Sequence, residues 1–152
     1  MLFSDEFLDH PESSLDCVDP FFVSGTVKNI TTRYVSQHTR EVFRSNLRLS
    51  KNPQKITHHE KTSDEFFKTN CRRYNFIYLD GNHEPQYIER DILNSFEHIQ
   101  MGGIIWMNDY GGKYGPYRTL LASVFDETLA SIARHAHFSL IHKGYQLAIQ
   151  VW

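Results

Sequence analysis

Three polar residues that offer metal-binding oxygens directly follow two apolar segments of the chain. Asp80 comes after residues 76–79, and Asn108 and Asp109 come after residues 104–107. If both segments are neighbouring parallel strands, these side chains meet at the edge where open α/β sheets bind ligands. Such a set suits Mg²⁺, which would lower the pKa of a bound hydroxyl and orient its oxygen towards an electrophile. The alternative is two ordinary polar turns.

Two more side chains are candidates for chemistry on the same reasoning. His83 lies three residues after Asp80 and could act as a general base or hydrogen-bond a substrate. Asp19 follows the short apolar segment 15–18, where a carboxylate can accept hydrogen bonds from ribose hydroxyls. Because Pro20 comes next, Asp19 could instead simply begin a turn. The other histidines have no partner at a zinc-type spacing, so we expect no zinc site.

The elements that must position these residues alternate along the chain. Apolar residues at three- and four-residue steps predict helices over 36–47, 63–67, 85–99 and 117–133, with Ser36 capping the first and Gly102-Gly103 ending the third. Short apolar runs predict strands over 15–18, 55–59, 76–79 and 104–107, and an antiparallel hairpin from 138–141 and 146–151. Apolar strands alternating with helices indicate an α/β fold whose mostly parallel sheet is covered on both faces.

Composition sets the broad class of the chain. Its 152 residues, 40% of them hydrophobic, suit one domain over residues 1–152. A formal net charge of −2 gives no field that attracts nucleic acid or a membrane, so we expect a small-molecule partner. Cys17 and Cys71 form no disulfide framework or metal spacing, which favours a reducing compartment, the cytoplasm.

Two segments carry a family resemblance. Residues 74–83, which end in Asp80-Gly81-Asn82-His83, resemble the fourth-strand motif of class I S-adenosylmethionine-dependent methyltransferases of the D-G-x-H branch. Residues 101–110 resemble that branch's Gly-Gly and fifth-strand pattern, which usually finishes in Asp-Asp-Tyr. Residues 15–21, 61–66 and 144–146 are similar to its second strand, its adenine-pocket stretch and its terminal hairpin.

The resemblance implies a Rossmann-like fold, a cofactor and a site. Asp19 would bind the ribose of S-adenosylmethionine, Ser63 would lie near its adenine, and Asp80 would also serve the cofactor. Asp80, Asn108 and Asp109 would hold Mg²⁺ or another divalent cation, with Asp80 and His83 as the catalytic residues. The activity implied is metal-assisted methylation of a hydroxyl on a small molecule or glycan.

The sequence departs from the family pattern at two points. Asn108 stands where the family usually has aspartate, so we expect weaker metal binding. Residues 1–80 contain one glycine, Gly25, so we expect the first strand and its glycine-rich turn to be missing, with another chain of a homo-oligomer as one way to fill the gap. Two alternatives stay open: an inactive, truncated interaction module, and an Mg²⁺-dependent oxygenase-like member of the same branch.

Overall fold

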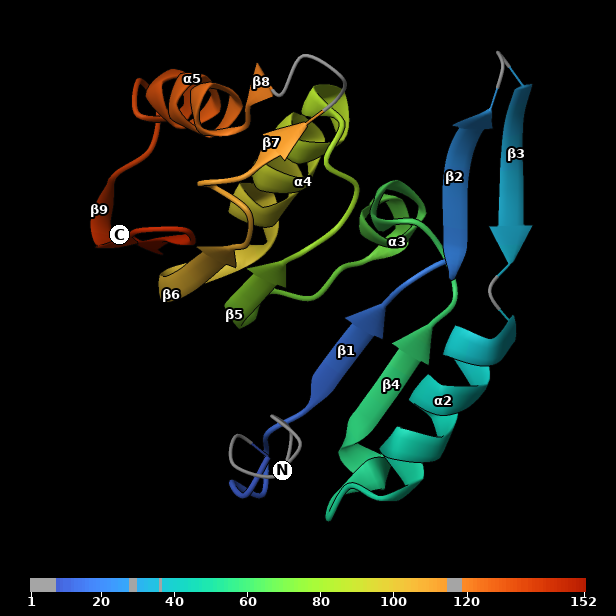
Figure 1. Cartoon of the computed structure of the whole chain (residues 1–152). Coiled ribbons are helices and arrows are strands. Elements are labelled where there is room, and N and C mark those ends of the chain that lie inside the picture. The colour runs from blue at the N-terminus through green and yellow to red at the C-terminus, as the bar shows by residue number, and fades with distance from the viewer. Residues whose placement is uncertain (1–7, 28–29, 36, 115–118) are drawn as a thin grey trace. The chain divides into compact units, whose positions relative to one another are not determined.

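The computed structural model describes residues 8–27, 30–35, 37–114 and 119–152, and for 22–35, 114 and 119–120 it describes the backbone alone. The chain divides into two compact units, Met1–Phe66 and Phe67–Trp152. Each unit is an arrangement of strands and helices (Figure 1). This division does not decide the number of domains, so a single domain stays a prediction.

The first unit is built on a pair of parallel strands. β1 (Leu15–Val18) pairs with β4 (Ile56–His59), which follows a short 3₁₀ turn, η1 (Pro53–Lys55). The α-helix α2 (Gln37–Arg48) packs on this pair through Phe43, whose ring lies 4.9 Å from that of His58. α3 (Ser63–Thr69) begins at the end of this unit and continues into the second.

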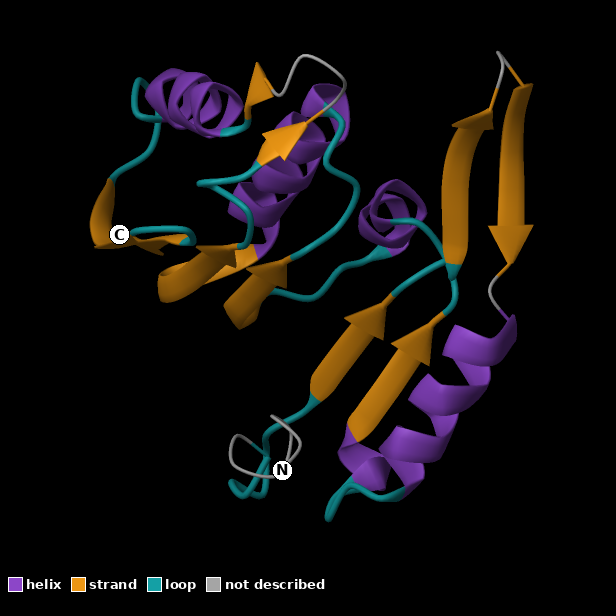
Figure 2. Ribbon diagram, in the orientation of Figure 1, coloured by secondary structure: helices purple, strands orange, loops and turns teal. Residues whose placement is uncertain are grey.

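A hairpin that the sequence did not lead us to expect completes the first unit. β2 (Phe22–Val27) and β3 (Ile30–Val35) pair antiparallel over their full length. Only two residues separate these strands. Both strands are rich in β-branched and aromatic residues, and two such segments joined by a two-residue connection are typical of a hairpin. Figure 2 shows the two long arrows of this hairpin in orange.

The second unit contains a four-stranded sheet in the order β5-β6-β10-β9. β5 (Tyr74–Leu79) and β6 (Ile99–Met107) are parallel, whereas β10 (Leu147–Val151) is antiparallel to both β6 and β9 (Phe138–Lys143). The closing antiparallel hairpin is therefore confirmed. Among the described residues β1 pairs only with β4 and β5 only with β6, so each has one edge without a neighbouring strand.

Two helices cover one face of this sheet. α4 (Pro85–His98) and α5 (Ala122–Ile132) lie on the same side of β5 and β6 (Figure 1). The buried residues of these helices pack against alternate residues of β6 and β10. Alternate residues of a strand lie on the same face of the sheet, because successive side chains point to opposite faces. The core members include Ile92, Ile105, Met107, Leu121, Leu147 and Ile149, all at most 1% exposed.

The predicted starts of two elements, β6 and α5, were wrong, and the glycine pair does not end α4. α4 ends at His98, before the glycine pair, and Gly102 and Gly103 lie inside β6, where Gly102 adopts a φ of +80°. α5 starts at Ala122 because Thr119–Leu120 forms β8, which pairs with β7 (Lys113–Tyr114). The predicted cap Ser36 and the predicted helix start at residue 117 lie outside the described residues. None of the helices in the described ranges has the length and apolar character needed to span a bilayer.

Candidate functional site

The parallel ladder of β5 and β6 brings the predicted metal-binding residues together. The register pairs Leu79 with Met107, and the backbone N–H of Asn108 donates to the carbonyl of Leu79 at 2.8 Å. The ladder thus continues past the last strand residue. Asp80 and Asn108 therefore lie side by side at the carboxyl edge of the sheet, as predicted from their positions after the two apolar segments.

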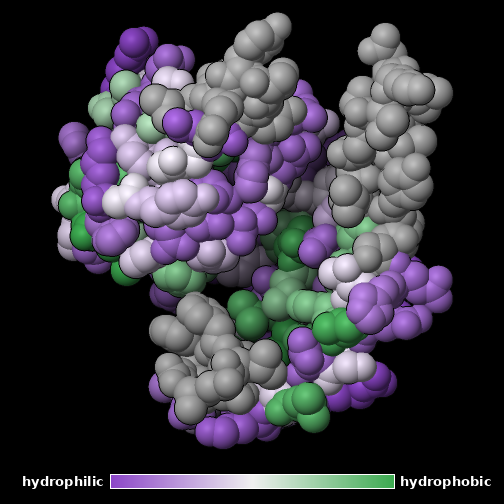
Figure 3. Space-filling model, in the orientation of Figure 1, coloured by the Kyte–Doolittle hydropathy of each residue, from purple (hydrophilic) through white to green (hydrophobic). Residues whose placement is uncertain are grey.

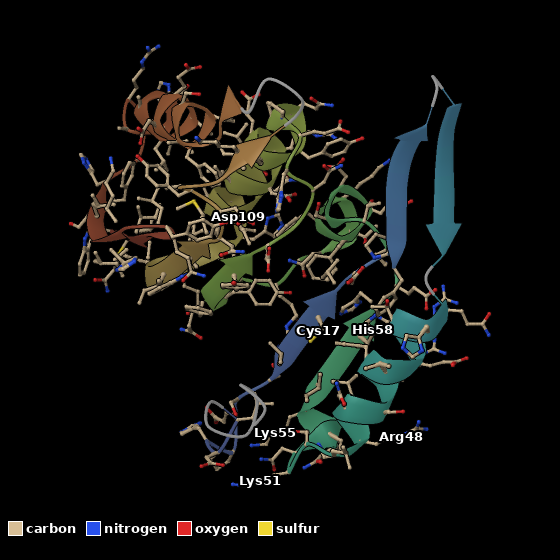
Figure 4. All side chains as sticks on the ribbon, in the orientation of Figure 1. Cys17, Arg48, Lys51, Lys55, His58 and Asp109 are labelled. Atoms are coloured by element: carbon tan, nitrogen blue, oxygen red, sulfur yellow. The ribbon has the colours of Figure 1, made fainter. Side chains whose placement is uncertain are left out.

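Asp109 takes a special backbone conformation at this edge. Its φ is +58°, in the left-handed region that aspartate tolerates better than most residues. Its carbonyl accepts a hydrogen bond from the N–H of Gly112 at 2.8 Å, which closes a turn after β6. This turn holds the carboxylate beyond the carboxyl ends of β5 and β6, where Figure 4 labels it.

Three side chains form a candidate metal centre. The ligand atoms of Asp80, His83 and Asp109 all lie within 4.8 Å of one another. His83 Nε2 is 2.8 Å from Asp109 Oδ2, and the Asp109 side chain is only 15% exposed. Two carboxylate oxygens and one imidazole nitrogen are a suitable donor set for a divalent cation, so the residues present fit such an ion.

Asn108 lies in the cluster, but with its amide nitrogen towards the carboxylates. Its Nδ2 donates to Asp80 Oδ1 and to Asp109 Oδ2, at 3.1 Å each. Its Oδ1 accepts a hydrogen bond from Gln146 Nε2 at 2.8 Å. To serve as a metal ligand through oxygen, as the sequence suggested, this amide would have to turn over.

A small cavity lies beneath the cluster. Its volume is about 20 Å³, which is room for a water molecule or an ion and far too little for a nucleoside cofactor. Its walls combine the acidic cluster with the apolar core, and they are formed by Leu79–His83, Ile88, Asp91, Ile92, Asn108, Asp109, Leu121 and Phe125. Asp91, which is 8% exposed, places a further carboxylate in this wall.

Asp19 and Ser63, the remaining predicted residues, belong to the first unit. Asp19 follows β1, and its Oδ1 accepts a hydrogen bond from the backbone N–H of Phe21 at 2.7 Å, which is the turn role considered as its alternative. Ser63 is the first residue of α3. The helix is capped by Thr62, whose Oγ1 accepts from the N–H of Glu65 while Glu65 Oε2 accepts from the N–H of Thr62, a capping box.

Sequence reasoning missed the hydrogen-bonding partners that the β9–β10 turn contributes. Tyr145 donates its hydroxyl proton to Asp109 Oδ1 at 2.5 Å, and its backbone carbonyl accepts from the N–H of Gly111. The bond to Asp109 raises the pKa of Tyr145 above its ordinary value. For nearby Tyr78, burial first and then the charges of Asp80 and Asp109 raise the pKa. The signals in the sequence were the position of Tyr145 in a predicted turn and the resemblance of residues 144–146 to the family's terminal hairpin.

An α/β fold with acidic side chains at the carboxyl ends of parallel strands defines a Rossmann-like class of protein. Within that class, a family model described as a methyltransferase domain matches residues 2–110, from before β1 to just beyond the acidic cluster. The chain belongs to this methyltransferase-domain family, which confirms the resemblance to methyltransferases at the level of the family. No curated protein matches the sequence.

Solved structures show the same fold at low sequence identity. A Corynebacterium glutamicum protein is 14% identical with a TM-score of 0.62, over 93% of this chain and 62% of that one. A methyltransferase from Podospora anserina, solved with S-adenosylhomocysteine bound, is 15% identical with a TM-score of 0.57, over 77% of this chain and 57% of that one. An O-methyltransferase family protein from Burkholderia thailandensis is 10% identical with a TM-score of 0.51, over 93% and 44%. The chain thus spans about three fifths or less of the length of these proteins.

Proposed function

We propose that this chain serves S-adenosylmethionine-dependent methyl transfer to a hydroxyl group of a small molecule or glycan, assisted by a divalent cation. The observation that carries the proposal is the grouping of Asp80, His83 and Asp109 within 4.8 Å, at the strand ends of a methyltransferase-domain fold. S-adenosylhomocysteine in the Podospora anserina protein supports the choice of cofactor.

The cation would be held by Asp80 and Asp109, with a turned Asn108 as a further ligand. The metal would supply Lewis-acid chemistry, lowering the pKa of a bound hydroxyl. In the structure Asn108 donates to both carboxylates, and Tyr145 donates to Asp109 as well. These hydrogen bonds orient the two carboxylates.

His83 would manage the acceptor's proton. Its ring is exposed on the turn after β5, with Nε2 held 2.8 Å from Asp109 Oδ2. A carboxylate partner that accepts from one ring nitrogen orients the imidazole and leaves its other nitrogen to accept a proton, which is the arrangement a general base needs. We therefore propose that Asp109 orients His83 to take the proton from the acceptor hydroxyl.

The cofactor would be bound by Asp19, Ser63 and Asp80. A carboxylate after a parallel strand can accept hydrogen bonds from ribose hydroxyls. Asp19 is exposed and has the right position, since it directly follows β1, but one of its oxygens is engaged by the N–H of Phe21. Ser63 at the start of α3 would lie near the adenine.

Isothermal titration of S-adenosylmethionine into the full chain, with and without Mg²⁺, tests the proposal. We expect binding that Asp19→Ala abolishes, whereas Asp9→Ala, an exposed aspartate outside the site, should bind like the native chain. Asp80→Asn should remove the effect of Mg²⁺ and leave the fold intact. Absence of cofactor binding by the native chain would contradict the proposal.

A catalytically inactive interaction module is the second candidate. Two observations favour it: the Asn108 amide faces the carboxylates with nitrogen, and Asp19 is engaged in a turn. The same titration separates the two functions, because an interaction module needs no cofactor. Mass analysis of the reaction product separates methylation from the oxygenase-like alternative.

Partners and location remain proposals. A homo-oligomer is supported by the edge strand β9, which exposes Leu140 and Ile141 at 53% and 45%; the hydrophobic colour at this end of the second unit is visible in Figure 3. Light scattering would test it.

Cys17 and Cys71 are free thiols, which suits the cytoplasm. We propose no nucleic acid or membrane partner.

A further inference from the structure

A directional set of hydrogen bonds runs from the sheet to the acidic cluster. Trp106 Nε1 donates to Gln146 Oε1 at 2.9 Å, and Gln146 Nε2 donates to Asn108 Oδ1 at 2.8 Å. Asn108 Nδ2 then donates to Asp80 Oδ1 and Asp109 Oδ2, at 3.1 Å each. Trp106, Gln146 and Asn108 are all half-buried, so their polar groups have limited access to water.

The chemistry at the two ends fixes the direction of every bond between them. An indole N–H can only donate, and ionised carboxylates can only accept. If Asn108 alone turned over, its oxygen would face Asp80 and Asp109, and its NH₂ group would face the NH₂ group of Gln146. If Gln146 turned as well, its NH₂ group would face the indole N–H of Trp106. Each such mismatch leaves a donor or acceptor unsatisfied.

We infer that Gln146 is a positioning residue which, braced by Trp106, holds the Asn108 amide with its NH₂ group towards Asp80 and Asp109 and thereby weakens cation binding there. The effect on cation binding rests on the proposed function. The orientation of the Asn108 amide by Gln146 does not depend on it. A cation must compete with the NH₂ group for the two carboxylate oxygens, and the Asn108 oxygen is turned away from it.

Titration of Mn²⁺ into the full chain tests the inference. Trp106→Phe removes the donor that orients Gln146, and Gln146→Met removes the group that orients Asn108; neither changes the charge near the cluster. Each variant should bind Mn²⁺ about tenfold more tightly than the native chain, which corresponds to about 1.4 kcal/mol. Trp152→Phe is the matched control, because its indole N–H donates to Ser139 Oγ instead; its affinity should equal the native value.

A second readout needs no metal. The side-chain NH₂ resonances of Asn108, identified by their loss in Asn108→Asp, should shift and broaden in Trp106→Phe and Gln146→Met but not in Trp152→Phe. Unchanged resonances, or Mn²⁺ affinity that is unchanged or weaker in both variants, would overturn the inference. If no variant binds Mn²⁺, the cation part of the proposed function fails, and the resonances alone decide the role of Gln146.

Discussion

Replacing Asn108 by aspartate should destabilise the metal-free chain and make its stability depend on a cation. In the structure the Asn108 NH₂ group lies between two carboxylates and donates to both, at 3.1 Å each. A third carboxylate at this position cannot donate, so both bonds are lost and two like-charge contacts replace them. The bond from Gln146 is kept, because a carboxylate oxygen still accepts it.

The size of the effect follows from these contacts. Asp80 is exposed, so each lost bond should cost about 1 kcal/mol, which is below the range for bonds to charged groups because water screens the interaction. Two unit charges about 4 Å apart in water repel by about 1 kcal/mol. The two lost bonds and the two like-charge contacts together predict a loss of about 4 kcal/mol. For a chain of this size that lowers Tm by about 8–16 °C.

Thermal unfolding measures three quantities: the total loss of stability in EDTA, the stability recovered with excess Mn²⁺, and the charge repulsion removed at high salt. Mn²⁺ at about 100 times its Kd should return about 2.7 kcal/mol, and about 1 M salt should remove most of the repulsion, since the Debye length falls to about 3 Å. The matched control is Asn75→Asp, an exposed residue of β5 whose amide donates to Gln100 and not to a carboxylate. A native Tm for metal-free Asn108→Asp, with no response to Mn²⁺, would refute the reasoning.

Two further predictions concern the turn of the β9–β10 hairpin and the glycine pair inside β6. Because the hydrogen bond to Asp109 raises the pKa of Tyr145, the phenol should stay protonated above pH ~10, and any stability from this bond should be present below that pH and lost as the pH rises. Asp109→Asn should lower that pKa in an ultraviolet titration that uses Tyr145→Phe as its blank, and an unmoved titration would contradict the assignment. Gly103→Ala should lower the free energy of unfolding by about 1–3 kcal/mol, because the new Cβ would lie 2.9 Å from the backbone oxygen of Gln100. Gly144→Ala, whose Cβ would meet only the movable ring of His142, is the control, and equal losses would count against this explanation.

Local patterns predicted the elements that carry strong apolar periodicity. β5 and α4 lie within two residues of the predicted bounds, because an apolar run and a three- to four-residue stripe each specify a buried face. The β2–β3 hairpin was missed because neither strand is a continuous apolar run, although both are rich in the β-branched residues that favour strands. The late start of α5 was missed because β8 forms only by pairing with β7, which a helical pattern cannot reveal.

As with the fold, local sequence patterns predicted part of the site. Asp80, His83, Asn108 and Asp109 come together because adjacent parallel strands end at one edge, which the sequence could indicate. The partners of these residues arrive from the β9–β10 turn, and its position depends on the antiparallel register between β10 and β6. The orientation of the Asn108 amide depends on that turn too, so no local pattern could have predicted it.

A pair of neighbouring carboxylates needs hydrogen-bond donors or a cation beside it, and in this chain side chains supply donors. The NH₂ group of Asn108 and the ring of His83 both face Asp109. Whatever satisfies the carboxylates in the metal-free chain must be displaced by a cation, so stability without metal and affinity for metal are linked with opposite signs. Across the native chain, Trp106→Phe and Asn108→Asp, Mn²⁺ affinity should therefore rise as metal-free Tm falls. A variant series in which both quantities rise together would mean that Asn108 and the cation do not compete for the same oxygens.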